Sequence, residues 1–399
     1  MNVLITNYFI RNFTGSEINA LQLCLALRNL GIKADVATFF YDQPLKRVFE
    51  DHQIRVKNLL DENLELGEYD LFWTHHIHTI NHLLFHFEPH PAKFIYSCLG
   101  PFSPLAVPPY YHSELNFILS NSEGNTSILL EEGLAEEKIH FFPNFAPKEF
   151  FEQHRTQPST KPQKIGVISN HPPDEINNFS RIAMEQGYQV EFIGFKGQQV
   201  LVTPELLKQF DVAISIGKTV QYCFALKTPI YCYDHFGGPG FIDQNNIQTS
   251  QYYNFSGRGI DRKLSGYEIF EEITGLYQKA RSNLDFLFDY AKEHFMLEKN
   301  IEVLLKKLSE HEKIDLSKVR QKYALTKRHH LDFLEKLKYQ IRLEEEISGR
   351  SRGALHTISR HQEIADLEQE ILSYTLSTSW RLTRPFRKLM NIFRKKNDV

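Results

Sequence analysis

Residues 210–243 read FDVAISIGKTVQYCFALKTPIYCYDHFGGPGFID, and this stretch decides the fold of the 399-residue chain. Two apolar runs, 211–216 and 229–233, have the character of buried strands, and a helical pattern at 219–227 lies between them. A glycine-bearing turn follows each run. The order predicts a β-loop-α-β-loop unit of an open parallel sheet, in which ligands bind beyond the carboxyl ends of the strands.

Both turns carry groups that suit an anion. The first would open the helix, so that backbone N–H groups, the helix dipole and the ammonium of Lys218 converge there. In the second, glycines permit close approach of a backbone to a ligand, and Pro239 stiffens one step. We therefore expect a diphosphate site, with these members: Gly217, Lys218, Thr219, His235, Gly237, Gly238 and Gly240.

Two other interpretations exist for these turns. Gly217-Lys218-Thr219 has the ending of the phosphate loop of nucleotide triphosphatases, but that motif requires a glycine where the chain has Val212, so we exclude it. The second interpretation is that both are ordinary turns of an α/β sheet. Their position at the ends of adjacent strands favours a ligand site.

The first half of the chain begins with a βαβ pattern. Strands are predicted at 2–9 and 32–40, around a helix that ends at Gly31. The fingerprint GxGxxG is missing, so a nicotinamide enzyme is not predicted. The turn Thr14-Gly15-Ser16-Glu17 still places a helix N-terminus at the end of a strand, where Gly15 could face a substrate phosphate or hydroxyl.

Further strands are predicted at 70–76, 93–99 and 116–122, and histidines gather after the first of them: His75, His76, His78, His82 and His86. Their spacing does not define a metal site, and we expect no metal. His75 and His76, at the end of the strand, are candidates for contact with a sugar hydroxyl, because histidine exchanges protons near neutral pH. A structural hydrogen bond is the alternative for each.

A second alternating β/α set follows a linker at 153–163 that is rich in proline and polar residues, and it consists of the segments 164–179, 186–195 and the stretch 210–243. Ser169, Asn170 and His171 stand at a strand end where they could meet a nucleotide. Two such domains in tandem would hold a substrate in the cleft between them. The predicted division is 1–152 for the first domain, 164–300 for the second, 301–376 for a helical extension and 377–399 for a tail.

The order of these motifs resembles the GT-B glycosyltransferases, in particular the family-4 type of bacterial polysaccharide biosynthesis. The similar segments are the TGSE turn, the LQLCLALRNLGIKADV helix and strand, YDLFWTHH, ILSNSEGNTSILLEEG, the FFPNFAPKEF turn and the stretch 210–242, which together span about residues 1 to 245. The resemblance implies two Rossmann-like domains and transfer of a sugar, hexosyl or deoxyhexosyl, from a nucleotide-activated donor. It places the donor mainly on the second domain and the acceptor mainly on the first.

Carried over by position, the resemblance assigns Gly237, Gly238 and Gly240 to a loop near the donor diphosphate, and Gly15 to the first-domain loop. Asn144 corresponds to the asparagine of the turn before the linker. The family's pair of glutamates is replaced by Ile214 and Tyr222, which implies a different ribose contact or a deoxyribose nucleotide. No metal or other cofactor is implied. The candidates for a base that activates the acceptor hydroxyl are His75, His76, Glu17 and Asp234, and Asp234 could equally cap the glycine turn.

Beyond about residue 265 the composition changes to helix formers, with apolar seams at 334–341 and 364–374 that fit either a coiled-coil homodimer or a hairpin against the chain's own domains. The tail has seven basic residues and no acid between Trp380 and Lys396, and its apolar residues share one helical face. This pattern is typical of a helix on an anionic membrane surface, and the apolar face argues against nucleic-acid binding.

The bulk composition adds few constraints. The net charge is −3, no window has the length of a membrane span, and the four cysteines show no metal spacing. We expect a cytoplasmic enzyme, peripheral at the inner face of the cell membrane, that extends a capsule-like or O-antigen-like glycan on a lipid-linked acceptor. The alternatives are a degenerate GT-B module that binds a glycan or a partner enzyme without turnover, and a GT-B sugar epimerase.

Overall fold

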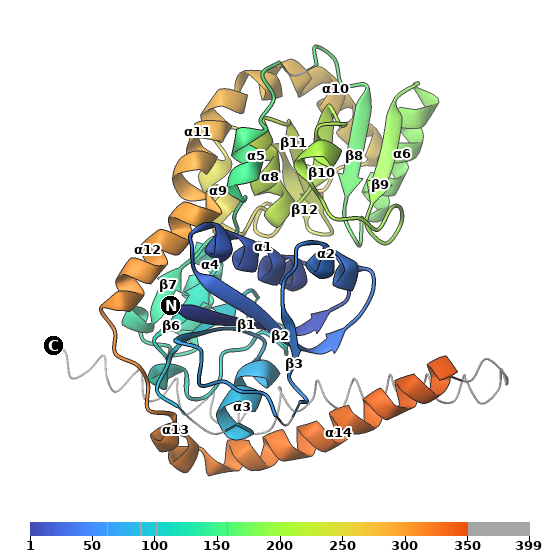
Figure 1. Cartoon of the computed structure of the whole chain (residues 1–399). Coiled ribbons are helices and arrows are strands. Elements are labelled where there is room, and N and C mark those ends of the chain that lie inside the picture. The colour runs from blue at the N-terminus through green and yellow to red at the C-terminus, as the bar shows by residue number, and fades with distance from the viewer. Residues whose placement is uncertain (62, 88–89, 101–102, 158, 350–399) are drawn as a thin grey trace.

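The computed structural model describes residues 1–349, except 62, 88–89, 101–102 and 158, and folds them into two α/β domains with a helical C-terminal part. Each domain has one sheet. The first sheet has seven parallel strands in the order β3-β2-β1-β4-β5-β6-β7, and the second has five strands in the order β12-β11-β10-β8-β9. Figure 1 shows the second domain stacked on the first. The predicted mixed α/β class with parallel sheets is confirmed.

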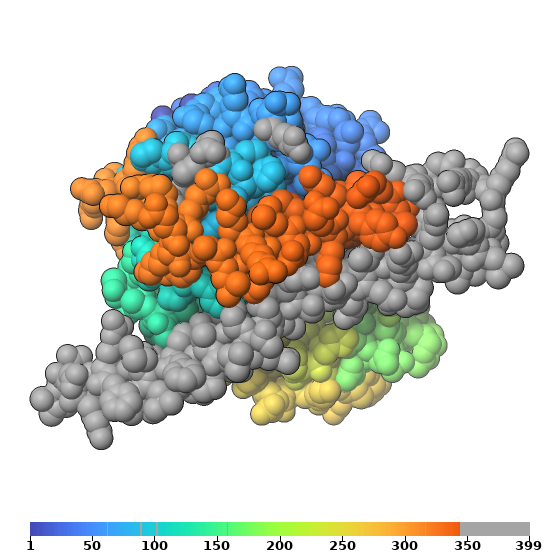
Figure 2. Space-filling model, turned by 90° about the horizontal axis from the view of Figure 1, so that it is seen from below, coloured from blue at the N-terminus to red at the C-terminus, as the bar shows by residue number. Residues whose placement is uncertain are grey.

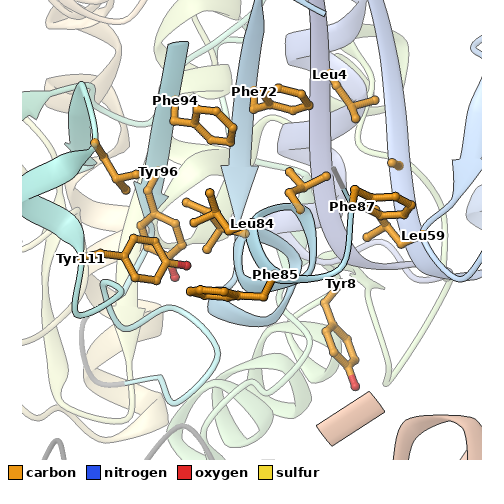
Figure 3. Close-up of a cluster of buried hydrophobic side chains, with 14 of the residues drawn as sticks. Leu4, Tyr8, Leu59, Phe72, Leu84, Phe85, Phe87, Phe94, Tyr96 and Tyr111 are labelled. Atoms are coloured by element: carbon orange, nitrogen blue, oxygen red, sulfur yellow. The ribbon is translucent and has the colours of Figure 1, made fainter. Parts of the chain in front are cut away.

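The first domain alternates strands and helices as its apolar pattern predicts. Its elements are β1 (Asn2–Ile10), α1 (Gly15–Asn29), β2 (Lys33–Tyr41), α2 (Leu45–Asp51), β3 (Val56–Asn58), β4 (Leu71–His75), α3 (Ile77–Phe85), β5 (Lys93–Cys98), η1 (His112–Glu114), β6 (Phe117–Ser120), α4 (Glu123–Glu131), η2 (Glu136–Lys138), β7 (Ile139–Phe141) and α5 (Lys148–Glu152). One face of the sheet packs on α3 through an aromatic cluster that includes Phe72, Phe85 and Phe94 (Figure 3). The other face packs on α1.

The second domain contains β8 (Lys164–Ile168), α6 (Asp174–Glu185), β9 (Gln189–Ile193), α7 (Pro204–Leu207), β10 (Val212–Ser215), α8 (Lys218–Leu226), β11 (Ile230–Asp234), β12 (Gly237–Phe241), α9 (Ile247–Tyr252), α10 (Gly266–Ser282) and α11 (Leu284–His294). Helices α6 and α10 cover one face of its sheet, and α8 with α11 covers the other. The strand-helix-strand unit predicted in 210–243 is therefore β10, α8 and β11.

One local prediction in this unit is wrong. Residues 237–241 form strand β12 rather than a loop, and this strand pairs antiparallel with β11. The physical reason is space: a Cβ on Gly238 would lie 2.1 Å from the carbonyl oxygen of Cys232, and one on Gly237 would lie 2.2 Å from that of Arg262. These glycines make room for neighbouring backbone, so the hairpin turn shrinks to His235 and Phe236.

The C-terminal helices return to the first domain. Helix α12 (Leu297–Ser309) packs on α1 and buries Leu297, Ile301, Leu304 and Leu308 in the first-domain core. The domain boundary that we placed at residue 300 therefore lies inside α12. Helices α13 (Leu316–Lys322) and α14 (Ala324–Gly349) follow, and Figure 2 shows α14 lying across the first domain. The seam predicted at 364–374 and the tail 377–399 lie outside the described residues.

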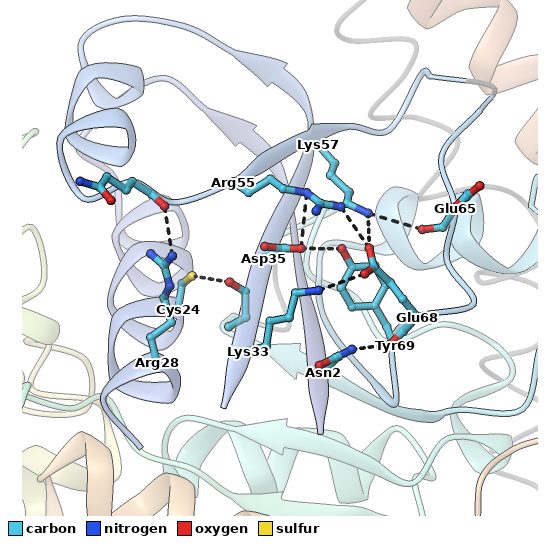
Figure 4. A network of polar contacts seen from close by, with 12 residues as sticks. Asn2, Cys24, Arg28, Lys33, Asp35, Arg55, Lys57, Glu65, Glu68 and Tyr69 are labelled. Atoms are coloured by element: carbon cyan, nitrogen blue, oxygen red, sulfur yellow. Dashed lines mark hydrogen bonds and ion pairs between the residues drawn. The ribbon is translucent and has the colours of Figure 1, made fainter. Parts of the chain in front are cut away.

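A network of polar side chains lies at the amino ends of the first-domain strands (Figure 4). The Glu68 carboxylate accepts hydrogen bonds from Lys57 and Lys33, which lower its pKa to about 2, and it also pairs with Arg55. Tyr69 donates to Asp35 at 2.7 Å. The charged groups at this end of the sheet thus have partners within the protein. In the part of the chain that is described, none of the helices has the length and apolar character needed to cross a membrane.

Candidate functional site

A cavity of about 990 Å³ lies between the two domains, at the carboxyl ends of β8, β10 and β11. Strand β8 lies inside its sheet, with β9 on one side and β10 on the other, so the chain reverses direction across the sheet between β8 and β10. Such a switch point leaves a crevice in open α/β sheets. The first domain contributes residues from the start of α1, from α4 and from the segment after β5.

The end of β8 supplies three predicted site residues, Ser169, Asn170 and His171, all of which line the cavity. The Ser169 hydroxyl accepts a hydrogen bond from the His171 backbone N–H at 3.2 Å, so this turn is locally ordered. The His171 ring lies edge-on to Phe195, which is about half exposed and also lines the cavity. The wall beyond β8 therefore offers amide, imidazole and aromatic surfaces.

Helix α8 begins at the cavity, as predicted. Its N-cap residue, Gly217, has φ of 57° and leaves the first turn without a side-chain cap. Lys218 and Thr219 line the cavity, whereas Gly217 does not. A helix start without a side-chain cap, opening on a cavity, is a favourable place for an anion.

The Lys218 ammonium is directed away from this helix start, toward the first domain. It donates a hydrogen bond to the side-chain oxygen of Asn19 and lies 3.5 Å from the ring centroid of Phe145. Burial holds the pKa of Lys218 well below its usual value. Nearby, the Tyr222 hydroxyl donates to the Gln22 side chain at 2.8 Å. Lys218 and Tyr222, one turn apart on α8, thus join the second domain to α1.

Asp234, a predicted base, lines the cavity at the end of β11, and two backbone groups bond to it. One carboxylate oxygen accepts from Phe236 N–H at 2.8 Å, and the other accepts from Gly257 N–H at 3.0 Å. The first bond closes the tight turn before β12, which corresponds to the capping role given above as the alternative. The second bond holds a distant segment against this turn.

That segment, residues 252–258, was missed by the sequence analysis. Tyr252, Tyr253, Asn254, Ser256 and Arg258 line the cavity. The Arg258 guanidinium carbon lies 5.2 Å from the ring centroid of Phe236. The signal in the sequence was an arginine between two glycines in a turn-rich stretch, which only the folded chain brings to the end of β11.

The other predicted residues fall into two groups. Gly15 lines the cavity, and a Cβ there would meet no atom within 4 Å. His235 lines it as well. In contrast, Gly237, Gly238 and Gly240 do not line it, because they lie in β12 and face protein atoms.

The three candidate bases on the first domain are buried and hydrogen-bonded within that domain. One Glu17 oxygen accepts from the backbone N–H groups of Arg11 and Asn12, both at 2.6 Å, although burial raises the pKa of Glu17. His76 accepts from Tyr8 N–H at 3.2 Å, and His75 bonds to the Thr6 carbonyl at 3.1 Å. None of the three lines the large cavity. Each histidine thus makes a hydrogen bond of the structural kind given as the alternative, while the Nε2 of His75 is buried without a hydrogen-bond partner.

His78, His82 and His86 lie on or at the end of α3, beside α14. His82 bonds to His330 of α14 at 3.0 Å, and the His78 ring stacks on Phe333 at 4.1 Å. Within the described residues, no group of three or more histidines, cysteines or carboxylates could hold a metal ion. These histidines join α14 to the first domain.

Solved structures with a similar fold are known. HepE (Alr3699) of Anabaena, crystallised with UDP, superposes with a TM-score of 0.52 at 12% identity over 78% of this chain and 100% of HepE. Its crystal structure with UDP and glucose gives 0.50 at 14% identity, with the same coverage. The fold is GT-B. Likeness at this identity establishes the architecture of two domains around a cleft and nothing finer. No protein-family model and no curated protein matches the chain.

Proposed function

We propose that this chain is a glycosyltransferase that takes a sugar from a nucleotide-activated donor. The observation that supports it is the inter-domain cavity at the switch point of the second sheet, onto which the start of α8, without a side-chain cap, opens. A departing nucleoside diphosphate gains negative charge, and an N-terminal helix turn with a nearby cation stabilises that charge. HepE, the similar fold, was crystallised with UDP and with glucose, which fits such a donor.

The finer parts of the proposal rest on the sequence. We propose the family-4 type, a hexosyl or deoxyhexosyl donor, no metal, and an acceptor that is a lipid-linked cell-surface polysaccharide of the capsule or O-antigen kind. The basic amphipathic pattern of 377–399 supports attachment to the inner face of the membrane. A homodimer through the C-terminal helices remains a proposal, and the packing of α14 on its own first domain favours the hairpin alternative.

The first-domain wall of the cavity carries the acceptor in this proposal. It consists of the loop at Phe13 and Gly15, the segment after β5, and α4 with Ser127 and Glu131. These hydroxyl, carboxylate and backbone groups suit a sugar acceptor, since sugars need donors and acceptors at defined positions. Gly15 leaves space at the entrance of α1, because no protein atom lies within 4 Å of its missing Cβ.

The test is donor turnover and binding with a matched pair of variants. Calorimetry with UDP, GDP, CDP and dTDP, followed by release of the diphosphate from the corresponding sugars, should find one preferred nucleotide. Gly15→Leu places a side chain in the cavity at the start of α1 and should reduce turnover at least about 100-fold, whereas Gly275→Leu, at an exposed position of α10, should not. Binding of a nucleotide without any turnover of its sugars would favour the degenerate module. Binding of none would overturn the donor site.

A further inference from the structure

The proposed function requires a cation at the departing diphosphate, and the cavity supplies two side chains for that role. Among the described residues that line it, the lysine and arginine side chains are Lys218 and Arg258. They come from different segments of the second domain: Lys218 opens α8, and Arg258 follows α9. The surroundings of Lys218 and Arg258 differ, and this difference indicates which of the two cations binds the diphosphate.

Lys218 is occupied by the domain contact. Its side chain is partly buried, and its ammonium donates to Asn19 and lies against the Phe145 ring, both on the first-domain side. No carboxylate accompanies it among these contacts, and burial lowers its pKa. Moving the ammonium to a ligand would break a partly buried hydrogen bond between the domains. Arg258 is exposed, and a guanidinium keeps its charge and can bond to two phosphate oxygens at once.

Arg258 stands on a strap, residues 252–258, that is fixed at three points. The Tyr252 hydroxyl donates to Ser127 of α4 at 3.2 Å. The Asn144 side chain donates to the Asn254 side-chain oxygen at 2.9 Å. The Gly257 N–H donates to Asp234, and a Cβ on Gly257 would lie 2.1 Å from the Gly237 carbonyl oxygen. The strap therefore fits tightly against the β11–β12 hairpin and also touches the first domain.

Asp234 bonds to the two backbone segments that position the Arg258 guanidinium. One of its oxygens fixes the backbone next to Arg258, and the other fixes the backbone of Phe236, whose ring lies beneath the guanidinium. A carboxylate that accepts two backbone N–H groups is already engaged as a structural acceptor. We infer that Arg258 binds the diphosphate of the donor, and that Asp234 is the residue that positions Arg258 rather than the base of the reaction. This inference rests on the proposed function and identifies the cation that binds the donor diphosphate.

The first test measures how affinity depends on phosphate. Calorimetry with the preferred nucleoside, its monophosphate and its diphosphate should show that Arg258→Met weakens the diphosphate about 10- to 100-fold and leaves the nucleoside unchanged. Arg181→Met is the matched control, since Arg181 is an exposed arginine of the same domain, paired with Glu185 and away from the cavity. Equal diphosphate affinity in wild type and Arg258→Met would overturn the inference while leaving the proposed function intact. Failure of the wild type to bind any diphosphate would overturn both.

The second test separates positioning from base catalysis. Asp234→Asn keeps one acceptor oxygen and loses the other, so diphosphate affinity should fall by a factor similar to that of Arg258→Met. In the double variant the two losses should not multiply, because they act through one contact. A base would behave differently: kcat and the acid limb of its pH profile would change while diphosphate affinity stayed constant, and that result would overturn the positioning role.

A third variant, Phe236→Ala, tests the Arg258 site without disturbing the buried core. Asp234 is buried, and Asp234→Asn could reduce the amount of folded protein. Phe236 is 50% exposed, so Phe236→Ala removes the ring beneath the guanidinium without opening a core cavity. We expect its diphosphate affinity to fall several-fold, with the melting temperature unchanged. Unchanged affinity in Phe236→Ala would remove the ring from the inferred site.

Discussion

The carboxyl edges of the two sheets differ in what their polar side chains contact. At the first-domain edge, Glu17, His75 and His76 bond to the backbone of their own domain and are buried. At the second-domain edge, Ser169, Thr219 and His235 line a large cavity. Both edges follow the same rule of topology, in which polar groups collect where parallel strands end. The difference teaches that position at a strand end does not by itself make a residue part of a site.

The physical distinction is the partner of each polar group. A buried donor or acceptor costs free energy unless it is paired, so groups paired within the protein are explained by the fold alone. Asp234 is the intermediate case, because it lines the cavity and yet has two backbone partners. The stability of the first-domain edge and ligand binding at the second-domain edge can therefore be changed separately by substitution.

The largest expected effect concerns the glycines of β12. Gly238→Ala should destabilise the protein by about 3 kcal/mol or more, because its Cβ would overlap the Cys232 carbonyl oxygen. Urea unfolding measures the change. Gly275→Ala, at an open helical position, should instead stabilise by about 0.5–1 kcal/mol. If the Gly238→Ala protein were stable but had lost nucleotide binding, Gly238 would be part of the binding site after all.

Glu17 should matter for stability and not for donor binding. Glu17→Gln replaces the carboxylate that accepts from Arg11 and Asn12, and should cost about 1–2 kcal/mol in urea unfolding. Its nucleoside diphosphate affinity should equal that of the wild type. Asp234→Asn, the corresponding change at the other edge, should lose affinity, so the two carboxylates form a matched pair. Glu17→Gln protein with normal stability and lost turnover would instead support a catalytic carboxylate.

The smallest expected effect is a pH dependence of the first domain. Burial lowers the pKa of His75 to about 4, well below the unfolded value of about 6.5. Below pH 6.5 the unfolded chain binds this proton and the folded chain does not, so stability falls as pH decreases from 6.5 toward 4. His75→Gln should remove about 1 kcal/mol of the stability difference between pH 7.5 and pH 5.5.

The measurement is the urea midpoint at the two pH values. Trp73→Phe serves as control, because it disturbs the same edge by removing the bond to Ser97 and does not titrate. Its pH dependence should match that of the wild type. If His75→Gln and the wild type show the same pH dependence, the histidine is charged in the folded protein and our account of this edge is wrong.

Much of the fold was predictable from the sequence, for a local reason. Apolar runs such as 211–216 and 229–233, with a helical period between them, specify strand, helix and strand without reference to the rest of the chain. The strand ends of the second domain were predicted in the same way. Ser169, Lys218 and Thr219, which were named at those ends, line the cavity. The GGPG segment misled the prediction, because glycine serves close backbone contact as readily as ligand approach.

The remaining features depended on contacts between distant parts of the chain. Arg258 reaches the end of β11 only because Gly257 bonds to Asp234, 23 positions earlier in the sequence. The direction of the Lys218 ammonium is set by Asn19, which lies 199 positions away. Helix α12 joins the first-domain core although it follows the second domain in sequence. Sequence periodicity reports which face of an element is apolar, but it does not report which partner covers that face.

The amino-acid sequence by itself determined the α/β class, the two sheets and the strand ends at which polar residues collect, because these follow from local periodicity and turn chemistry. Tertiary structure alone decided which of those residues are exposed to the cavity and which are satisfied inside a domain. Burial and hydrogen-bond partners set the availability of a polar group, and both arise only when α1, α8 and the 252–258 strap meet between the domains.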